Sequence, residues 1–186
     1  AAVAPAHAAM CPRCRRELGH LERVGAAIVA GLAPATMHKP QPSEPSPPSA
    51  PSPPRGITAA GDVPAPLARL IGERLDDIPW RRLGPGVWHY PLRIAGQGDL
   101  RLFKAAPGRG VPEHGHAGSE LTLVLRGALQ DATGRYGRGD VADLDESVEH
   151  HPVADAEAGC ICIVASESPA RFRGLLARLL QPLHRM

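Results

Sequence analysis

Aromatic residues are scarce in this chain: phenylalanine, tryptophan and tyrosine together make up 3% of its 186 residues. Proteins that hold single-stranded nucleic acid stack its bases on such rings, so this scarcity argues against a surface of that kind. Excess charge of one sign is also lacking, because the formal net charge is only +2. Electrostatics therefore gives little reason to expect nucleic acid as a direct partner.

Long apolar runs are missing as well. No run approaches the roughly 20 residues that a helix needs to cross a bilayer. The first ten residues, AAVAPAHAAM, lack the basic region and unbroken apolar core of a signal peptide. These absences predict a soluble, cytoplasmic protein with no membrane partner. The chain also lacks an initiating methionine, and Ala1 falls inside an alanine-rich, helix-like pattern, so we expect native residues upstream.

Cysteine is limited to four residues in two close pairs, Cys11 with Cys14 and Cys160 with Cys162. A reducing cytosol disfavours structural disulfides, so such pairs are more often metal ligands or redox-reactive thiols. The cysteines therefore mark two regions, one near each end of the chain, where metal binding or thiol redox reactions are expected.

The sharpest change in composition is the segment KPQPSEPSPPSAPSPPRG at residues 39–56, where proline is dense and apolar side chains are almost absent. Such a segment cannot bury a core and is typical of a semi-extended linker. We therefore predict a small N-terminal segment at residues 1–38, a linker at 39–62 and a larger domain at 63–186.

The N-terminal segment carries one amphipathic helix. Within CRRELGHLERVGAAIVAGL, four apolar residues recur at spacings of three and four. They are Leu18, Leu21, Val24 and Ile28. One such helix cannot build a core by itself, so the segment needs a metal, further residues or a partner.

The larger domain begins with APLARLIGERLDDIPW, which predicts a short amphipathic helix bearing Leu67, Leu70, Ile71 and Leu75. Beyond about residue 87, short apolar segments alternate with glycines, which is typical of strands and turns. The predicted strands occupy residues 99–105, 120–125, 127–134, 139–144 and 159–166, and a helix is expected from residue 170 onwards. This spacing predicts a mainly β sandwich or barrel.

In the stretch VPEHGHAGSELTLVLRG, residues 111–127, side chains that can bind a metal precede an apolar run that is expected to be buried. His114 and His116 are two positions apart, so on a strand they share a face, and Glu120 follows across a small turn. Two histidines and a carboxylate form the ligand set of many zinc, iron and manganese sites. His150 and His151 in the following segment are candidates for a fourth ligand. The alternative interpretation is that these polar residues decorate surface loops.

The spacing Gly110-x3-His114-x-His116-x3-Glu120-x6-Gly127 resembles the first cupin motif, and Gly139-x5-Asp145-x-Ser147-x2-His150 resembles the second. Three departures are visible: Gly110 lies closer to the histidines than usual, and Asp145 and Ser147 replace a proline and a glycine. The resemblance implies a cupin barrel, a double-stranded β-helix of the jelly-roll type. It also implies that His114, His116, Glu120 and His150 bind one divalent metal, with zinc, iron, manganese or nickel as candidates. His151 should face the other side of its strand and not bind.

A second candidate cluster is His7-x3-Cys11-x2-Cys14. A C-x2-C turn brings two thiolates onto one tetrahedral ion, and a histidine one helical turn earlier can join them. A structural zinc wants four ligands, and neither His20 nor His38 is a compelling fourth.

This cluster, followed by an amphipathic helix, resembles the zinc-binding anti-sigma domain, whose further histidine lies on an earlier helix that would precede Ala1. Together with the cupin motifs, the chain is similar to ChrR-type anti-sigma factors. The similarity extends through PLARLIGERLDDIPWRRLG, HGHAGSELTLVLRGAL, GCICIVAS and LLQPL. It implies zinc bound by His7, Cys11 and Cys14. It also implies an extracytoplasmic-function sigma factor as partner, held away from RNA polymerase until an oxidative signal, singlet oxygen or an organic hydroperoxide, releases it. Without its first helix, we expect the chain to inhibit its sigma factor weakly or not at all.

Cys160 and Cys162 are expected to face the same side of a strand, too extended for an easy disulfide. They are either buried apolar residues or, as the resemblance implies, part of oxidant sensing near the cupin metal. Two alternatives to the regulatory function stay open: a metal-dependent cupin enzyme, dioxygenase or hydrolase-like, that acts on a small molecule, and a purely structural cupin that forms a homodimer.

Overall fold

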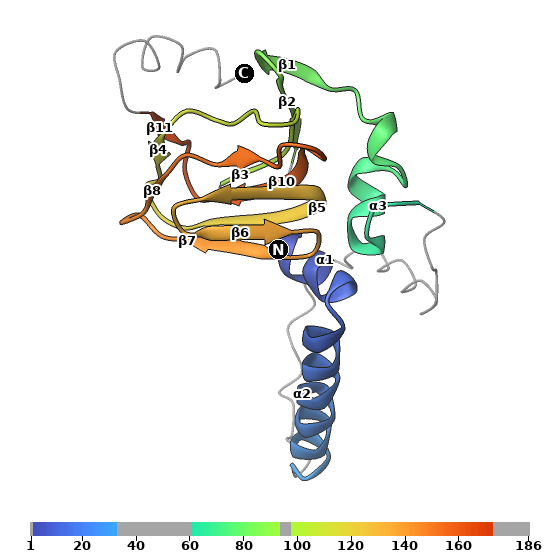
Figure 1. Cartoon of the computed structure of the whole chain (residues 1–186). Helices are drawn as coiled ribbons and strands as arrows, with labels where there is room; N and C mark the ends of the chain where they lie inside the picture. Colours follow the sequence, from blue (N-terminus) through green and yellow to red (C-terminus); the bar gives the residue numbers. More distant parts are fainter. Residues whose placement is uncertain (1, 33–60, 94–97, 173–186) are drawn as a thin grey trace, which may run out of the picture.

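The structure is a computed structural model that describes residues 2–32, 61–93 and 98–172. Strands dominate the larger domain, as predicted, and helices lie along one side and below it (Figure 1). The strands are β1 (Arg81–Gly84), β2 (Val87–Leu92), β3 (Asp99–Ala105), β4 (His114–Gly115), β5 (Glu120–Asp131), β6 (Gly134–Gly137), β7 (Val141–Leu144), β8 (Glu149–His150), β9 (Val153–Ala154), β10 (Cys160–Ser166) and β11 (Arg171–Phe172).

Within the described residues, this domain contains two antiparallel sheets. The larger runs in the order β1-β2-β3-β10-β5-β6, with β7 and β9 also paired to β5, and the smaller runs β11-β4-β8. Strand β5 is therefore the hub of the larger sheet, since β10, β6, β7 and β9 all pair with it. The smaller sheet places β4 beside β8.

The predicted break between residues 120–125 and 127–134 is wrong, because β5 continues through Gly127 to Asp131. Gly127 adopts a left-handed φ of 72°, and a Cβ there would lie 2.1 Å from the carbonyl oxygen of Gly159. Only glycine fits this conformation and this close approach. The strand bends at Gly127 without ending.

Alternating residues of β10 build two different apolar clusters, as a strand period of two requires. Ile161 and Ile163 belong to the core beneath the helices, whereas Cys160, Cys162 and Val164 pack in a second cluster on the other face. The two cysteines thus share a face, as the sequence predicted.

In the described part of the chain, three α-helices accompany the sheets: α1 (Val3–Met10), α2 (Pro12–Ala30) and α3 (Ala65–Ile71), with a short 3-10 turn at Leu75–Asp77. The helix predicted over residues 65–80 is shorter than expected, because Gly72 takes a φ of 82° and ends it. Leu67 and Leu75 are buried, but Leu70 is 44% exposed and lies off the core face.

Helix α2 projects away from the barrel (Figure 1), and none of its residues is buried. Its apolar stripe continues beyond the helix to Leu32, with side chains between 43% and 68% exposed. The stripe consists of Leu18, Leu21, Val24, Ile28, Val29 and Leu32. In the described residues, nothing in this chain covers it.

Ion pairs hold the segments on either side of α3 against the sheet. Arg126 of β5 forms ion pairs with Asp62 and with Asp76, whose Oδ1 lies 2.7 Å from Nη1. Burial alone would raise the pKa of Asp62, but hydrogen bonds from the Leu75 N–H and from Arg126 hold this pKa below its usual value. The hydrogen bond from Arg126 likewise lowers the pKa of Asp76.

The predicted C-terminal helix does not begin at residue 170. Arg171–Phe172 instead form strand β11 beside β4, because they complete the smaller sheet, and the rest of that predicted helix lies outside the described residues. Most of the predicted linker, up to residue 60, lies outside them too. In the described part of the chain, no helix has the length and apolar character needed to span a membrane.

Candidate metal centres

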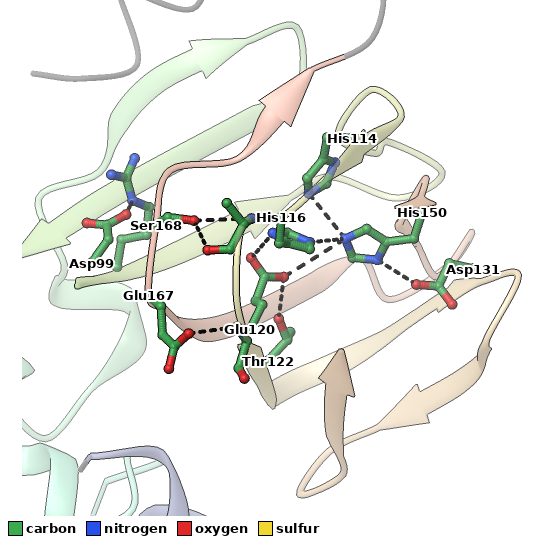
Figure 2. Close-up of polar contacts among 12 residues, drawn as sticks. Asp99, His114, His116, Glu120, Thr122, Asp131, His150, Glu167 and Ser168 are labelled. Carbon is green, nitrogen blue, oxygen red and sulfur yellow. Dashed lines mark hydrogen bonds and ion pairs between the residues drawn. The ribbon is translucent and has the colours of Figure 1, made fainter. Parts of the chain in front are cut away.

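Four side chains predicted as ligands converge inside the larger domain (Figure 2). One ligand atom from each lies within 4.8 Å of the others, and all four residues are buried. They are His114, His116, Glu120 and His150. The pairing of β4 with β8 sets His114 opposite His150, and the turn after β4 returns the chain to β5, which begins at Glu120.

Hydrogen bonds fix the tautomers of two of these rings. His114 Nδ1 lies 2.8 Å from the carbonyl oxygen of Pro112, and His150 Nδ1 lies 2.8 Å from Asp131 Oδ2. Both partners can only accept, so each Nδ1 carries the proton and each Nε2 presents a lone pair. These two Nε2 atoms lie 3.1 Å apart. Two lone pairs at this distance repel unless a cation lies between them.

The remaining two ligands lie against this pair. His116 Nε2 lies 3.1 Å from His150 Nε2, and His116 Nδ1 lies 3.2 Å from Glu120 Oε2 without a hydrogen bond of good geometry. Thr122 Oγ1 donates to Glu120 Oε1 at 3.3 Å. A divalent cation is the species that a set of lone pairs and one carboxylate suits best.

Burial sets the charge states of the cluster. It raises the pKa of Glu120 to about 7 and lowers the pKa values of His114 and His116 to about 4. Protons are therefore poor substitutes for a metal at the imidazoles of His114 and His116, which stay neutral near pH 7. The donor set fits a bound metal, which would compensate the desolvation of these four side chains.

Asp131 is a residue of this centre that the sequence analysis missed. Its side chain is only 1% exposed and accepts from His150 Nδ1. Burial alone would raise the pKa of Asp131, but hydrogen bonds from Thr133 and His150 lower it. Such a carboxylate orients a ligand histidine and raises its basicity. The pattern Asp131-x-Thr133 is typical of an ordinary turn, so no local signal distinguished it.

The second cysteine pair lies in the same cavity as this centre. The cavity has a volume of about 130 Å³ and is lined mainly by apolar side chains, with His114, Glu120 and His150 on its wall. Cys160 and Cys162 line it as well. A hydrogen bond with Cys160 and burial raise the pKa of the Cys162 thiol well above its usual value. Cys162 is therefore a protonated thiol at neutral pH.

The N-terminal cluster is also assembled. One ligand atom each from His7, Cys11 and Cys14 lies within 4.8 Å of the others, and His7 Nε2 lies 3.2 Å from Cys14 Sγ. Cys11 ends α1 and caps α2, with Pro12 in the first turn of α2. A hydrogen bond from the Cys14 backbone N–H lowers the pKa of Cys11, as expected at a helix N-terminus. The cluster offers two sulfurs and one nitrogen, a set that suits zinc.

Two other candidate histidines, His20 and His151, do not join these centres. His20 and His151 are exposed, so His151 points away from His150 as predicted, and His38 lies outside the described residues. The described residues supply three candidate ligands to the N-terminal cluster and four to the cupin-like cluster.

Comparison with known proteins supports the resemblance found in the sequence, along nearly the whole chain. Residues 70–169 match the family model described as the ChrR Cupin-like domain. The chain is 40% identical to the Anti-sigma-E factor ChrR of Cereibacter sphaeroides over 99% of its own length and 88% of that protein. It also resembles a chain in the crystal structure of Rhodobacter sphaeroides SigE in complex with the anti-sigma ChrR. That match has 37% identity, covers 88% of this chain and 86% of the other, and has a TM-score of 0.71.

The predicted cupin fold is thus confirmed, and so is the resemblance on which the ligand predictions were based. The family model supports the cupin-like domain, and the solved structure agrees with the described fold as a whole. The chain belongs to the ChrR family of anti-sigma factors.

Proposed function

We propose that this chain is an anti-sigma factor that sequesters an extracytoplasmic-function sigma factor and releases it on an oxidative signal. The observation that carries the first part is 40% identity, over nearly the whole chain, to a protein named an anti-sigma factor. A similar chain has been crystallised in complex with SigE. This relationship supports a regulator and not an enzyme. Because a sigma factor acts on RNA polymerase, the chain would work in the cytoplasm.

The apolar stripe of α2 is the surface that we assign to the sigma factor. A helix with one apolar face that none of the described residues covers suits insertion between helices of a partner. Cys14 lies in the first turn of α2, so metal held by the N-terminal cluster would anchor the helix at its base. A segment of this size, with one exposed helix, needs such an anchor to stay folded.

Sigma-factor binding can be tested with a purified extracytoplasmic-function sigma factor from the same genome. Leu21→Glu places a charge in the middle of the stripe and should weaken binding by about 2 kcal/mol or more, about 30-fold. Arg23→Gln changes the net charge equally on another face of α2 and should bind like the parent chain. Equal binding by both variants, measured by calorimetry, would contradict the assignment of this surface.

The cupin cavity is the part that we assign to signal reception. Cys160 and Cys162 share this cavity with Glu120, and a small oxidant entering it would meet both thiols and the metal ligands. A cysteine that loses its thiol proton would take one oxygen from a hydroperoxide onto its sulfur, which gives a sulfenic acid, and the hydroperoxide would take up the proton and leave as an alcohol. Oxidation at this position would disturb β10, which pairs with β5 along seven residues.

The sensing role is tested on a preformed complex with the sigma factor. An organic hydroperoxide should release the sigma factor from the parent chain, and release should slow in Cys160→Ser, Cys162→Ser and His114→Ala. Ser166→Ala, also on the cavity wall, is the matched control and should release normally. Unchanged release in all three variants would show that the cupin serves only as structure. Substrate-dependent oxygen uptake by the metal-loaded chain would favour the enzyme instead.

A further inference from the structure

His7 connects two regions that the sequence places far apart. Its Nε2 faces Cys14 Sγ in the N-terminal cluster, while its Nδ1 lies 2.7 Å from the carbonyl oxygen of Gly139, 132 residues away. A carbonyl oxygen can only accept, so Nδ1–H is the donor. The lone pair of Nε2 is therefore aimed toward the cysteines, as a metal ligand requires.

The Gly139 carbonyl is itself held by the cupin sheet. The Gly139 N–H donates to the carbonyl oxygen of Val124 at 2.8 Å, and the Val124 N–H donates to the carbonyl oxygen of Asp140 at 3.1 Å. Gly139 has a φ of 93°, a conformation that suits glycine. Val124 lies on β5, four positions after Glu120. One strand thus supplies a ligand to the cupin centre and anchors the carbonyl that orients His7.

Helix α1 packs against the cupin domain through buried apolar side chains. Val3 is 2% exposed and Ala6 is 0% exposed, and both belong to the main core cluster, against which Met10 also packs. Spacings of three and four residues put these three on one face of the helix. Through this face α1 contacts α3, β5 and β10, which brings His7 to Gly139.

We infer that the cupin positions His7 as a metal ligand, so that the N-terminal metal centre keeps its full affinity only while α1 is docked. This inference rests on the proposed metal centre at His7, Cys11 and Cys14. A ligand histidine commonly donates its other N–H to a carboxylate or carbonyl, and loss of that partner typically weakens metal binding about 10- to 100-fold. Here the partner belongs to the other domain.

The coupling is reciprocal by thermodynamic necessity. Metal at the N-terminal centre favours the docked helix, and any change that moves β5 or the Gly139 turn lowers the affinity for that metal. Because Cys14 lies in the first turn of α2, the same contact gives the cupin a direct route to the proposed sigma-binding helix.

The test compares two substitutions to aspartate in the first turn of α1, made in the full chain. Val3→Asp opposes burial of that position while suiting a helix N-terminus, so it should undock α1 and leave the helix intact. Ala4→Asp introduces the same charge at an exposed position. Each protein is loaded with zinc and titrated with a chelator, and alkylation of Cys11 and Cys14 is followed residue by residue by mass spectrometry.

Val3→Asp should lose zinc protection of these cysteines at a chelator concentration about 10- to 100-fold lower than Ala4→Asp, which should match the parent. Ala6→Leu, with exposed Ala9→Leu as its control, undocks α1 by overpacking and gives a second pair if Val3→Asp fails to fold. Nitrogen-15 spectra of the imidazoles should show His7 with its proton on Nδ1 in the parent and Ala4→Asp.

Equal zinc protection in a folded undocked variant and its control would overturn the inference and leave the metal centre intact. Absence of zinc protection in every protein, the parent included, would instead remove the metal centre itself. The two failures are therefore distinguishable.

Discussion

A single buried carboxylate decides how well the cupin centre can bind metal. Asp131 accepts the Nδ1 proton of His150, which leaves the lone pair of Nε2 free for the cluster. In Asp131→Asn the amide nitrogen would face Nδ1 and favour the opposite tautomer, with its proton on Nε2. We expect the cupin affinity for zinc to fall about 10- to 100-fold, measured by chelator competition in a Cys11→Ser, Cys14→Ser background. Asp143→Asn, an exposed change on β7, should have no effect.

Residues also show where prediction from sequence succeeds. His114, His116, Glu120 and His150 could be grouped because their spacing within two motifs is local, and strand geometry then sets which side chains share a face. Asp131 could not be found in this way, because its contact with His150 depends on how β5 and β8 approach each other. The contact of His7 with Gly139 was unpredictable for the same reason, since it joins two separately predicted domains.

At the scale of elements, the bend of β5 depends on one glycine. In Gly127→Ala the left-handed backbone alone costs roughly 1–3 kcal/mol, and the new Cβ would also clash with the carbonyl oxygen of Gly159, 2.1 Å away. We expect a loss of stability at least that large in chemical unfolding. Gly84→Ala, which has no atom within 4 Å of the new Cβ, should stay close to the parent. A parent-like Gly127→Ala would show that β5 does not bend as described.

The contact of Arg126 with Asp62 and Asp76 should make the attachment of α3 sensitive to acid. Both carboxyl pKa values are lowered in the folded chain, so their contribution to stability is complete above the unfolded pKa of about 4 and is lost as the pH falls below it. Arg126→Met should therefore be less stable than the parent at pH 7, and the difference should shrink as the pH falls through that range. Thermal melts between pH 7 and 3 measure this, and a constant difference would contradict it.

Elements were predicted well where their pattern is long and periodic, as in β3, β10 and α2. Sequence reasoning missed β1, β2 and β6, which its list of strands left out. It also missed β9 and β11, because two residues carry no readable alternation and form strands only through their neighbours. At β11 the sequence has a local helical pattern, but pairing with β4 overrides that pattern.

At the scale of the whole molecule, two separate metal centres predict a simple stoichiometry. We expect two metal equivalents in the parent chain and one in a variant carrying His114→Ala and His150→Ala. Cys11→Ser with Cys14→Ser should also leave one, and all four changes together should leave none. Elemental analysis by mass spectrometry gives these numbers and identifies each metal. A single equivalent in the parent would show that one centre does not bind.

Metal removal should also lower the melting temperature of the parent, since a ligand that binds only the folded state stabilises it. The shift should be smaller in either paired variant than in the parent, because each variant retains one centre. A chelator that leaves every melting temperature unchanged would contradict a folding role for both metals.

The isolation of α2 affects the fate of the chain after its partner dissociates. A helix of 19 residues with no buried side chain depends on its own backbone hydrogen bonds, which are marginal in water at that length. A free α2 therefore opens locally far more often than the barrel does, and such segments are the ones that proteases cut first. Once its partner has departed, the chain exposes a readily cleaved helix, which would turn a reversible separation into a permanent one.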